Sequence, residues 1–95
     1  MKFATLINFT EEGLQNIAQS PARAATFSKQ AKTAGLKISE LLWLNGRFDG
    51  LMVFDAPDAE TAAAAMLQLG KEGNVTTETL LAFDSDDMKQ VVDKL

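Results

Sequence analysis

The sequence predicts an α+β fold in which four antiparallel strands form one sheet and helices cover one of its faces. Apolar segments typical of strands alternate with helical patterns along the chain. The pair Asn45-Gly46 lies between two apolar segments near the middle, which is a strong signal for a β-hairpin with a two-residue type I′ turn. The length of 95 residues suits one domain (1–95) with one core.

The first strand is expected at Lys2–Phe9, where apolar and polar residues loosely alternate. Thr10 follows as the predicted N-cap of a helix, with acidic residues in its first turn. The side chains expected to form the buried stripe of this helix are Leu14, Ile17 and Ala18.

Ser20-Pro21 predicts the start of a second helical segment, with Ser20 as N-cap and Pro21 as its first residue. Its apolar face is expected to carry Ala24, Phe27, Ala31 and Ala34. Gly35 is the predicted residue just after the helix end.

Leu36–Leu44 and Arg47–Ala56 are the two strands of the predicted hairpin, which we expect to be the long central pair of the sheet. Asp58 is then expected to cap an Ala-rich helix over Thr61–Leu69, in which Met66 and Leu69 supply the larger core contacts. The final strand is predicted at residues 75–83.

Asp84 or Ser85 should cap a terminal helix at about 85–95, following a core of 2–83. Its apolar residues recur at helical spacing and are Met88, Val91, Val92 and Leu95. The complete order is β-α-β-β-α-β plus a helix, which is the ferredoxin-like arrangement.

The composition restricts the chemistry that the chain can perform. It has no His, Tyr or Cys, so the usual general base, the commonest metal ligand and a thiol nucleophile are all missing. The acidic group Asp84, Asp86 and Asp87 resembles the start of a calcium loop, but the Gly and Glu required later in that loop are absent, so we interpret it as helix capping. We predict no metal and no cofactor, and the sequence leaves open whether the protein is an enzyme.

The same composition indicates where the protein works. There is no signal-peptide pattern and no apolar run long enough for a membrane span, so we expect a cytoplasmic protein with no membrane partner. The net charge of −4 disfavours nucleic acid. The RNA-recognition fold shares this strand order, but Asp49 and Leu51 stand where its stacking aromatics are required. We therefore predict no nucleic-acid partner.

Three predicted strands are apolar on both faces, as the runs 41–44, 51–54 and 80–83 show. Strands of this kind are normally covered on both sides. Because helices can cover only one face of the sheet, we predict a homodimer or a larger assembly joined through the other face. The alternative is that the terminal helix and some exposed apolar surface suffice.

Several short motifs, taken in order, resemble the GYD domain family. They are Asn8-Phe9-Thr10, Pro21-Ala22-Arg23-Ala24, Gly46-Arg47-Phe48-Asp49, Ala56-Pro57-Asp58 and Gly73-Asn74-Val75. The third lies where that family carries a Gly-x-Tyr-Asp signature, with Phe48 in place of the Tyr. The resemblance implies a dimeric α/β-barrel arrangement of ferredoxin-like domains and no defined activity.

The residues expected to line a ligand pocket between the sheet and a partner copy are Asn8, Trp43, Phe48, Asp49, Thr77 and Thr79, with Glu40 beside them. For Trp43, a role as a core or interface anchor is the commoner case, because a Trp side chain buries a large area. Asp49 has two interpretations: a ligand contact or general base, or a carboxylate that accepts hydrogen bonds from loop amides or pairs with Arg23 or Arg47.

Three functions follow from these expectations. The first is a homo-oligomeric protein that binds an apolar or aromatic metabolite in a pocket between sheets. The second is an interaction module whose inter-sheet core is solid. The third and most remote is a cofactor-free enzyme of the monooxygenase or isomerase type, which the barrel resemblance implies.

Overall fold

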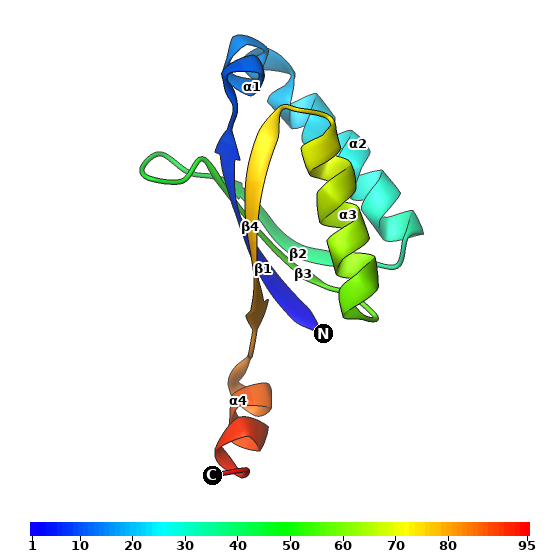
Figure 1. The fold of residues 1–95 in the computed structure, drawn as a ribbon, viewed down its shortest axis with the longest axis vertical. Coiled ribbons are helices and arrows are strands. Elements are labelled where there is room, and N and C mark those ends of the chain that lie inside the picture. The colour runs from blue at the N-terminus through cyan, green and yellow to red at the C-terminus, as the bar shows by residue number, and fades with distance from the viewer.

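The computed structural model describes residues 1–95 and contains one four-stranded antiparallel sheet (Figure 1). The elements, in chain order, are β1 (Lys2–Phe9), α1 (Glu11–Gln15), a 3-10 turn (Ile17–Gln19), α2 (Ser20–Thr33), β2 (Lys37–Trp43), β3 (Gly50–Asp55), α3 (Ala59–Lys71), β4 (Val75–Ala82) and α4 (Ser85–Val92). Both the predicted α+β class and the predicted element order are confirmed.

The strands lie in the order β2-β3-β1-β4, which fits the ferredoxin-like arrangement. Helices α2 and α3 cover one face of the sheet (Figure 1). The central pair is β1 and β3, which are antiparallel and pair from Lys2↔Asp55 to Ile7↔Gly50. The expectation that the two hairpin strands form the central pair is wrong, because β2 lies at one edge.

The predicted two-residue turn at Asn45-Gly46 is also wrong. Strand β2 ends at Trp43 and β3 begins at Gly50, so the connection is a six-residue loop. A type I′ turn requires positive φ at both central residues, and neither Asn45 nor Gly46 has it. The loop instead closes where the Leu44 N–H donates to the Asp49 carbonyl at 2.8 Å, which shortens both predicted strands.

A β-bulge in β2 explains why its apolar residues do not alternate. The register shifts between Ile38, opposite Phe54, and Glu40, opposite Val53, so Ser39 is an extra residue. Its hydroxyl donates to the Val53 carbonyl at 3.2 Å. The shift lets both Ile38 and Leu41 contact the core below the helices.

The core lies between the sheet and helices α2 and α3. Its buried hydrophobic residues are Phe3, Phe27, Ala31, Leu36, Met52, Phe54, Ala56, Ala62 and Met66. The rings of Phe3 and Phe54 stack on neighbouring central strands with their centroids 5.4 Å apart. The predicted core contacts of Met66 and Leu69 are confirmed, Leu69 being partly buried.

The first helical segment differs from its prediction. Leu14, Ile17 and Ala18, expected to be buried, are all exposed. The reason is that α1 spans only five residues and carries the chain to α2 rather than packing along the sheet. Thr10 is the N-cap as predicted and accepts from the Gly13 N–H at 3.1 Å.

Helix α2 begins and ends through specific residues. Ser20 is its first helical residue rather than its N-cap, because Gln19 occupies the cap and Ser20 has αR backbone angles. Gly35 follows the helix with φ +95°, and the Leu36 N–H donates to the Ala31 carbonyl at 2.9 Å, as in a Schellman motif. Ala34, expected on the buried face, is exposed at this end.

The other two helices have acidic caps. Asp58 caps α3 and accepts from the Thr61 N–H at 2.7 Å. Asp84 and Asp87 form a reciprocal capping box at the start of α4, which confirms that this acidic segment caps a helix. Helix α3 is longer than predicted and continues through Gly70 to Lys71.

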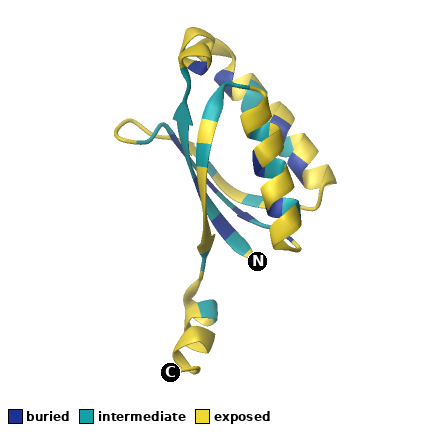
Figure 2. Ribbon diagram, viewed as in Figure 1, coloured by how far each residue is buried: buried dark blue, intermediate teal, exposed yellow.

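Helix α4 extends away from the body of the molecule (Figure 1). Its predicted apolar residues Met88, Val91, Val92 and Leu95 are all exposed (Figure 2). The helix therefore does not cover the second face of the sheet, so this part of the alternative to a homodimer is wrong. No helix is both long and apolar enough to cross a bilayer.

Candidate functional site

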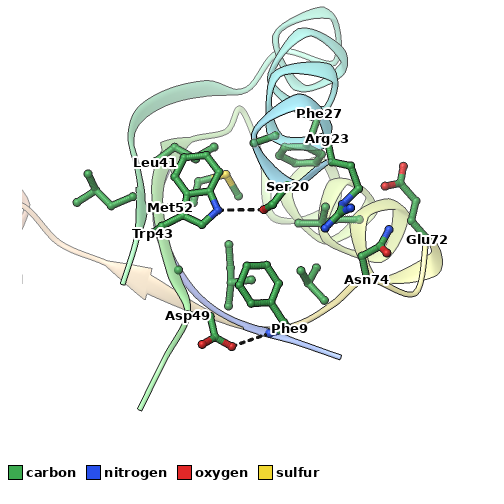
Figure 3. Close-up of a pocket in the computed structure, with 16 residues that line it drawn as sticks. Phe9, Ser20, Arg23, Phe27, Leu41, Trp43, Asp49, Met52, Glu72 and Asn74 are labelled. Carbon is green, nitrogen blue, oxygen red and sulfur yellow. Dashed lines mark hydrogen bonds between the residues drawn. The ribbon is translucent and has the colours of Figure 1, made fainter. Parts of the chain in front are cut away.

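A cavity of about 70 Å³ lies between the sheet and helices α2 and α3 (Figure 3). Sixteen residues line it and ten of them are hydrophobic, so its surface is mainly apolar. The polar side chains in the lining are Ser20, Arg23, Asp49, Glu72 and Asn74. A few polar groups in an apolar cavity are typical of ligand sites, although drug-sized ligands need roughly 300 Å³ or more.

Trp43 joins the end of β2 to the start of α2 at this cavity. Its indole Nε1–H donates to Ser20 Oγ at 2.9 Å (Figure 3). Ser20 is buried, whereas Trp43 remains 47% exposed. Trp43 is thus a polar anchor at the rim rather than a fully buried core residue.

Asp49 holds the end of the β2–β3 loop against β1. Its carboxylate Oδ2 accepts from the Phe9 N–H at 2.8 Å (Figure 3). Its own N–H donates to the Ile7 carbonyl, also at 2.8 Å. It forms no ion pair with Arg23 or Arg47, so the interpretation as an acceptor for backbone amides is the one that the geometry supports.

Arg23 enters the cavity from α2. Its Nη1 donates to the Asn16 carbonyl at 2.9 Å, which ties α2 to the preceding turn. Its Nη2 is buried and has no hydrogen-bond partner. A buried donor without a partner costs free energy, so this atom differs from the other polar groups of the lining.

The predicted pocket residues are only partly brought together. Trp43 and Asp49 line the cavity. Thr77 and Thr79 lie on the helix side of β4, where the Thr79 hydroxyl is 2.9 Å from that of Thr5. Asn8 lies on the opposite face of the sheet. Phe48 lies in the β2–β3 loop, where the centroid of its ring is 5.3 Å from Cζ of Arg47.

Ser20 and Arg23 were not predicted as site residues. The sequence does contain a signal for Arg23. It is four residues before the buried Phe27, which is four residues before the buried Ala31, so all three lie along one side of the helix. A charged residue in line with a buried helical stripe lies on the face that packs against the sheet. Ser20 was assigned to capping, which concealed its position on the same face.

The second surface of interest is the sheet face opposite α2 and α3, which we call the open face. Two rows of paired residues cross it from edge to edge. They are Leu42–Leu51–Leu6–Glu78 and Glu40–Val53–Ala4–Leu80. Leu42 and Leu80 are 47% and 48% exposed. The centre of the open face is therefore apolar, and the two glutamates lie on opposite edge strands.

Comparison with known proteins identifies the family. The model of the GYD domain matches residues 3–92. The chain belongs to the GYD domain family. A relative from Thermus thermophilus, named glutamine synthetase and cystathionine beta-lyase binding protein, is 30% identical to this GYD domain over 87 residues, which are 90% of this chain and 92% of the relative. No solved structure matches significantly.

The resemblance seen in the sequence is thus confirmed, and the structure gives the signature segment a local role. Gly46-Arg47-Phe48-Asp49 forms most of the β2–β3 loop of this GYD domain. Asp49 attaches that loop to β1, and the cation of Arg47 lies over the ring of Phe48. Neither contact requires a phenol hydroxyl at position 48.

Proposed function

We propose that this GYD domain is a self-associating protein-binding module that works through its open face. The observation behind the proposal is that no helix covers this face. The leucines and the valine of its two rows lie on the side of the sheet away from α2 and α3, and α4 does not reach them. Contiguous apolar surface of this kind is typical of protein interaction sites. Of the functions expected from the sequence, we place the interaction module first, and the name of the Thermus relative supports this order.

A second copy is the occupant that the open face suits best. Its apolar centre makes a patch that a twofold axis can place against itself, with the two glutamates at the edges. Helix α4, which leaves the end of β4, carries further exposed apolar residues toward any partner at that end (Figure 2). The dimeric barrel remains part of this proposal.

The name of the Thermus relative supports binding to other proteins as well. That relative is named for binding glutamine synthetase and cystathionine beta-lyase. We infer that the corresponding enzymes of this chain's own organism are the first heterologous partners to test. The open face or α4 would supply the contact area, since both expose apolar side chains.

Self-association is tested by sedimentation equilibrium of three proteins. The wild type should sediment at twice its chain mass of 10.3 kDa. Leu42→Glu places a charge on the open face and should yield monomers. Leu67→Glu is the matched control, because Leu67 is 74% exposed on α3, away from that face. Wild-type protein that sediments as a monomer at low micromolar concentration contradicts the proposal.

Heterologous binding is tested with the purified enzymes and the same variants. Glutamine synthetase and cystathionine beta-lyase are titrated separately with wild type, Leu42→Glu and Leu67→Glu, and binding is followed by sedimentation velocity. Binding that Leu42→Glu abolishes and Leu67→Glu preserves assigns the contact to the open face. Binding that survives both substitutions would show that the contact is not on the open face.

Small-molecule binding is the second function that we propose, and the cavity beside Arg23 is what favours it. The pocket between two sheets, expected from the sequence, would form only in the dimer. The cavity in Figure 3 instead lies within one copy, between sheet and helices. A thermal-shift screen against metabolites tests this function, since a ligand at 100 times its Kd should add about 2.7 kcal/mol to the free energy of unfolding.

A further inference from the structure

Two hydrogen-bond donors on one face of α2 have no acceptor within the chain. The first is Arg23 Nη2, which is buried. The second is the Ser20 hydroxyl, whose oxygen accepts from Trp43 but whose proton is donated to no residue. Ser20 and Arg23 are three residues apart in a helix, so their side chains lie on the same side. Both line the cavity.

The surroundings of these donors limit what they can bind. The cavity is mostly apolar, with Phe9, Phe27 and Trp43 in its lining. Two carboxylates also line it, but that of Asp49 is bound to the Phe9 N–H. Glu72 and Arg23 both line the cavity, but they form no salt bridge with each other (Figure 3).

We propose that the cavity is a binding site for a small monocarboxylate with a short apolar chain. The carboxylate would accept from Arg23 Nη2 and from the Ser20 hydroxyl. Hydrogen bonds from a guanidinium to a carboxylate are among the strongest in proteins. The apolar chain would contact the aromatic lining. A cavity of about 70 Å³ selects a ligand of only a few carbon atoms.

The inference rests on the second proposed function and assigns it a ligand class. An amide offers Arg23 Nη2 only a neutral acceptor, whereas a carboxylate offers an ionised one, and hydrogen bonds to ionised acceptors are stronger. The proposal therefore predicts that the cavity binds an ionised carboxylic acid more tightly than the corresponding neutral amide. The two compounds are nearly the same size, so charge is the main difference.

The test uses Trp43 as an internal reporter. It is the only Trp and the chain has no Tyr, so the intrinsic fluorescence comes from this one residue at the cavity. Sodium butyrate and butyramide are each titrated at constant ionic strength, with amide NMR spectra recorded in parallel. We expect saturable shifts at cavity residues with butyrate, and binding at least tenfold weaker with butyramide.

Matched variants assign the effect to Arg23. Arg23→Gln should weaken butyrate binding by about tenfold or more, as expected for a lost hydrogen bond to a charged group. Arg47→Gln removes the same charge from the exposed loop and should leave binding unchanged. If Arg23→Gln does not fold, Arg23→Lys is the substitute. It keeps the positive charge but lacks the planar guanidinium donors, so it should still weaken the binding of butyrate more than that of butyramide.

The outcomes separate this inference from the function on which it rests. Equal binding of butyrate and butyramide, unaffected by Arg23→Gln, would overturn the carboxylate assignment and leave small-molecule binding standing. Equal weakening by Arg23→Gln and Arg47→Gln would show general electrostatics and overturn it too. If neither compound nor any metabolite in the thermal-shift screen binds, both the inference and the small-molecule function fail.

Discussion

The Asp49 carboxylate accepts a hydrogen bond from the Phe9 backbone N–H at 2.8 Å, which joins the β2–β3 loop to the last residue of β1. The two residues are 40 positions apart, and both line the cavity. Asp49→Ala leaves the Phe9 N–H without an acceptor and should lower the free energy of unfolding by about 1–3 kcal/mol.

Urea denaturation of the wild type and three variants measures this effect. Asp49→Asn retains a side-chain oxygen that can accept, so its loss should be smaller. Arg47→Ala alters the same loop without touching Phe9 and serves as the control. An Asp49→Ala variant as stable as wild type would show that water replaces the carboxylate without cost.

Gly13 allows α1 to lie against the loop before β4. A Cβ at this position would overlap the backbone carbonyl of Asn74, the same oxygen that accepts from the Thr10 N–H. Gly13→Ala should therefore destabilise the protein by roughly 3 kcal/mol, as in severe overpacking. Gly46→Ala is the control, because nothing lies within 4 Å of its Cβ position, and thermal melts should show it unchanged or slightly stabilised.

Asp58, the N-cap of α3, should make part of the protein's stability depend on acidic pH. Hydrogen bonds from Thr61 hold the pKa of the Asp58 carboxyl below its ordinary value of 3.8. Because the folded-state pKa is depressed, the stabilisation is present above the unfolded pKa and is lost as pH falls through the folded one. The melting temperatures of wild type and Asp58→Ala should thus differ at neutral pH, begin to approach each other as pH falls below about 3.8, and meet only below the lowered folded-state pKa.

Asp84 provides the contrast for this experiment. Its pKa is also lowered, chiefly by the backbone hydrogen bond of Asp87. It caps α4, which lies apart from the core, so Asp84→Ala should lower the melting temperature less than Asp58→Ala does at neutral pH. A large loss with Asp84→Ala would show that α4 supports the core after all.

The Trp43–Ser20 hydrogen bond can be measured by a double-mutant cycle. Trp43→Phe removes the indole donor and Ser20→Ala removes its acceptor. The coupling free energy between the two changes should be about 1 kcal/mol in chemical denaturation. A coupling near zero would mean that the partly exposed indole gains nothing from Ser20 beyond what water offers.

The sequence predicted most elements because their signals are local. The alternation of Lys2–Phe9, the caps Thr10 and Asp58, and Gly35 at the end of α2 each depend on neighbours within a few residues. The hairpin turn failed because Asn45-Gly46 competes with a contact distant in sequence. Asp49 bonds to β1, which draws the loop open and makes β3 begin only at Gly50.

The site was less predictable for a related reason. Trp43 and Asp49 were identified from their place beside an apolar strand, but their partners Ser20 and Phe9 come from other parts of the chain. The bulge at Ser39 also changes which residues of β2 face the helices, and no local pattern marks it. Pairing across the sheet, rather than propensity, decides these positions.

Helix α4 has only eight residues, with its apolar side chains exposed to water. Isolated helices shorter than about 12–15 residues are marginal in water, so α4 should be fully formed only when its apolar side is covered. Folding of this segment would then be coupled to association. Circular dichroism should show helical content that rises with protein concentration, and the ordering cost would weaken the assembly enough for one partner to be exchanged for another.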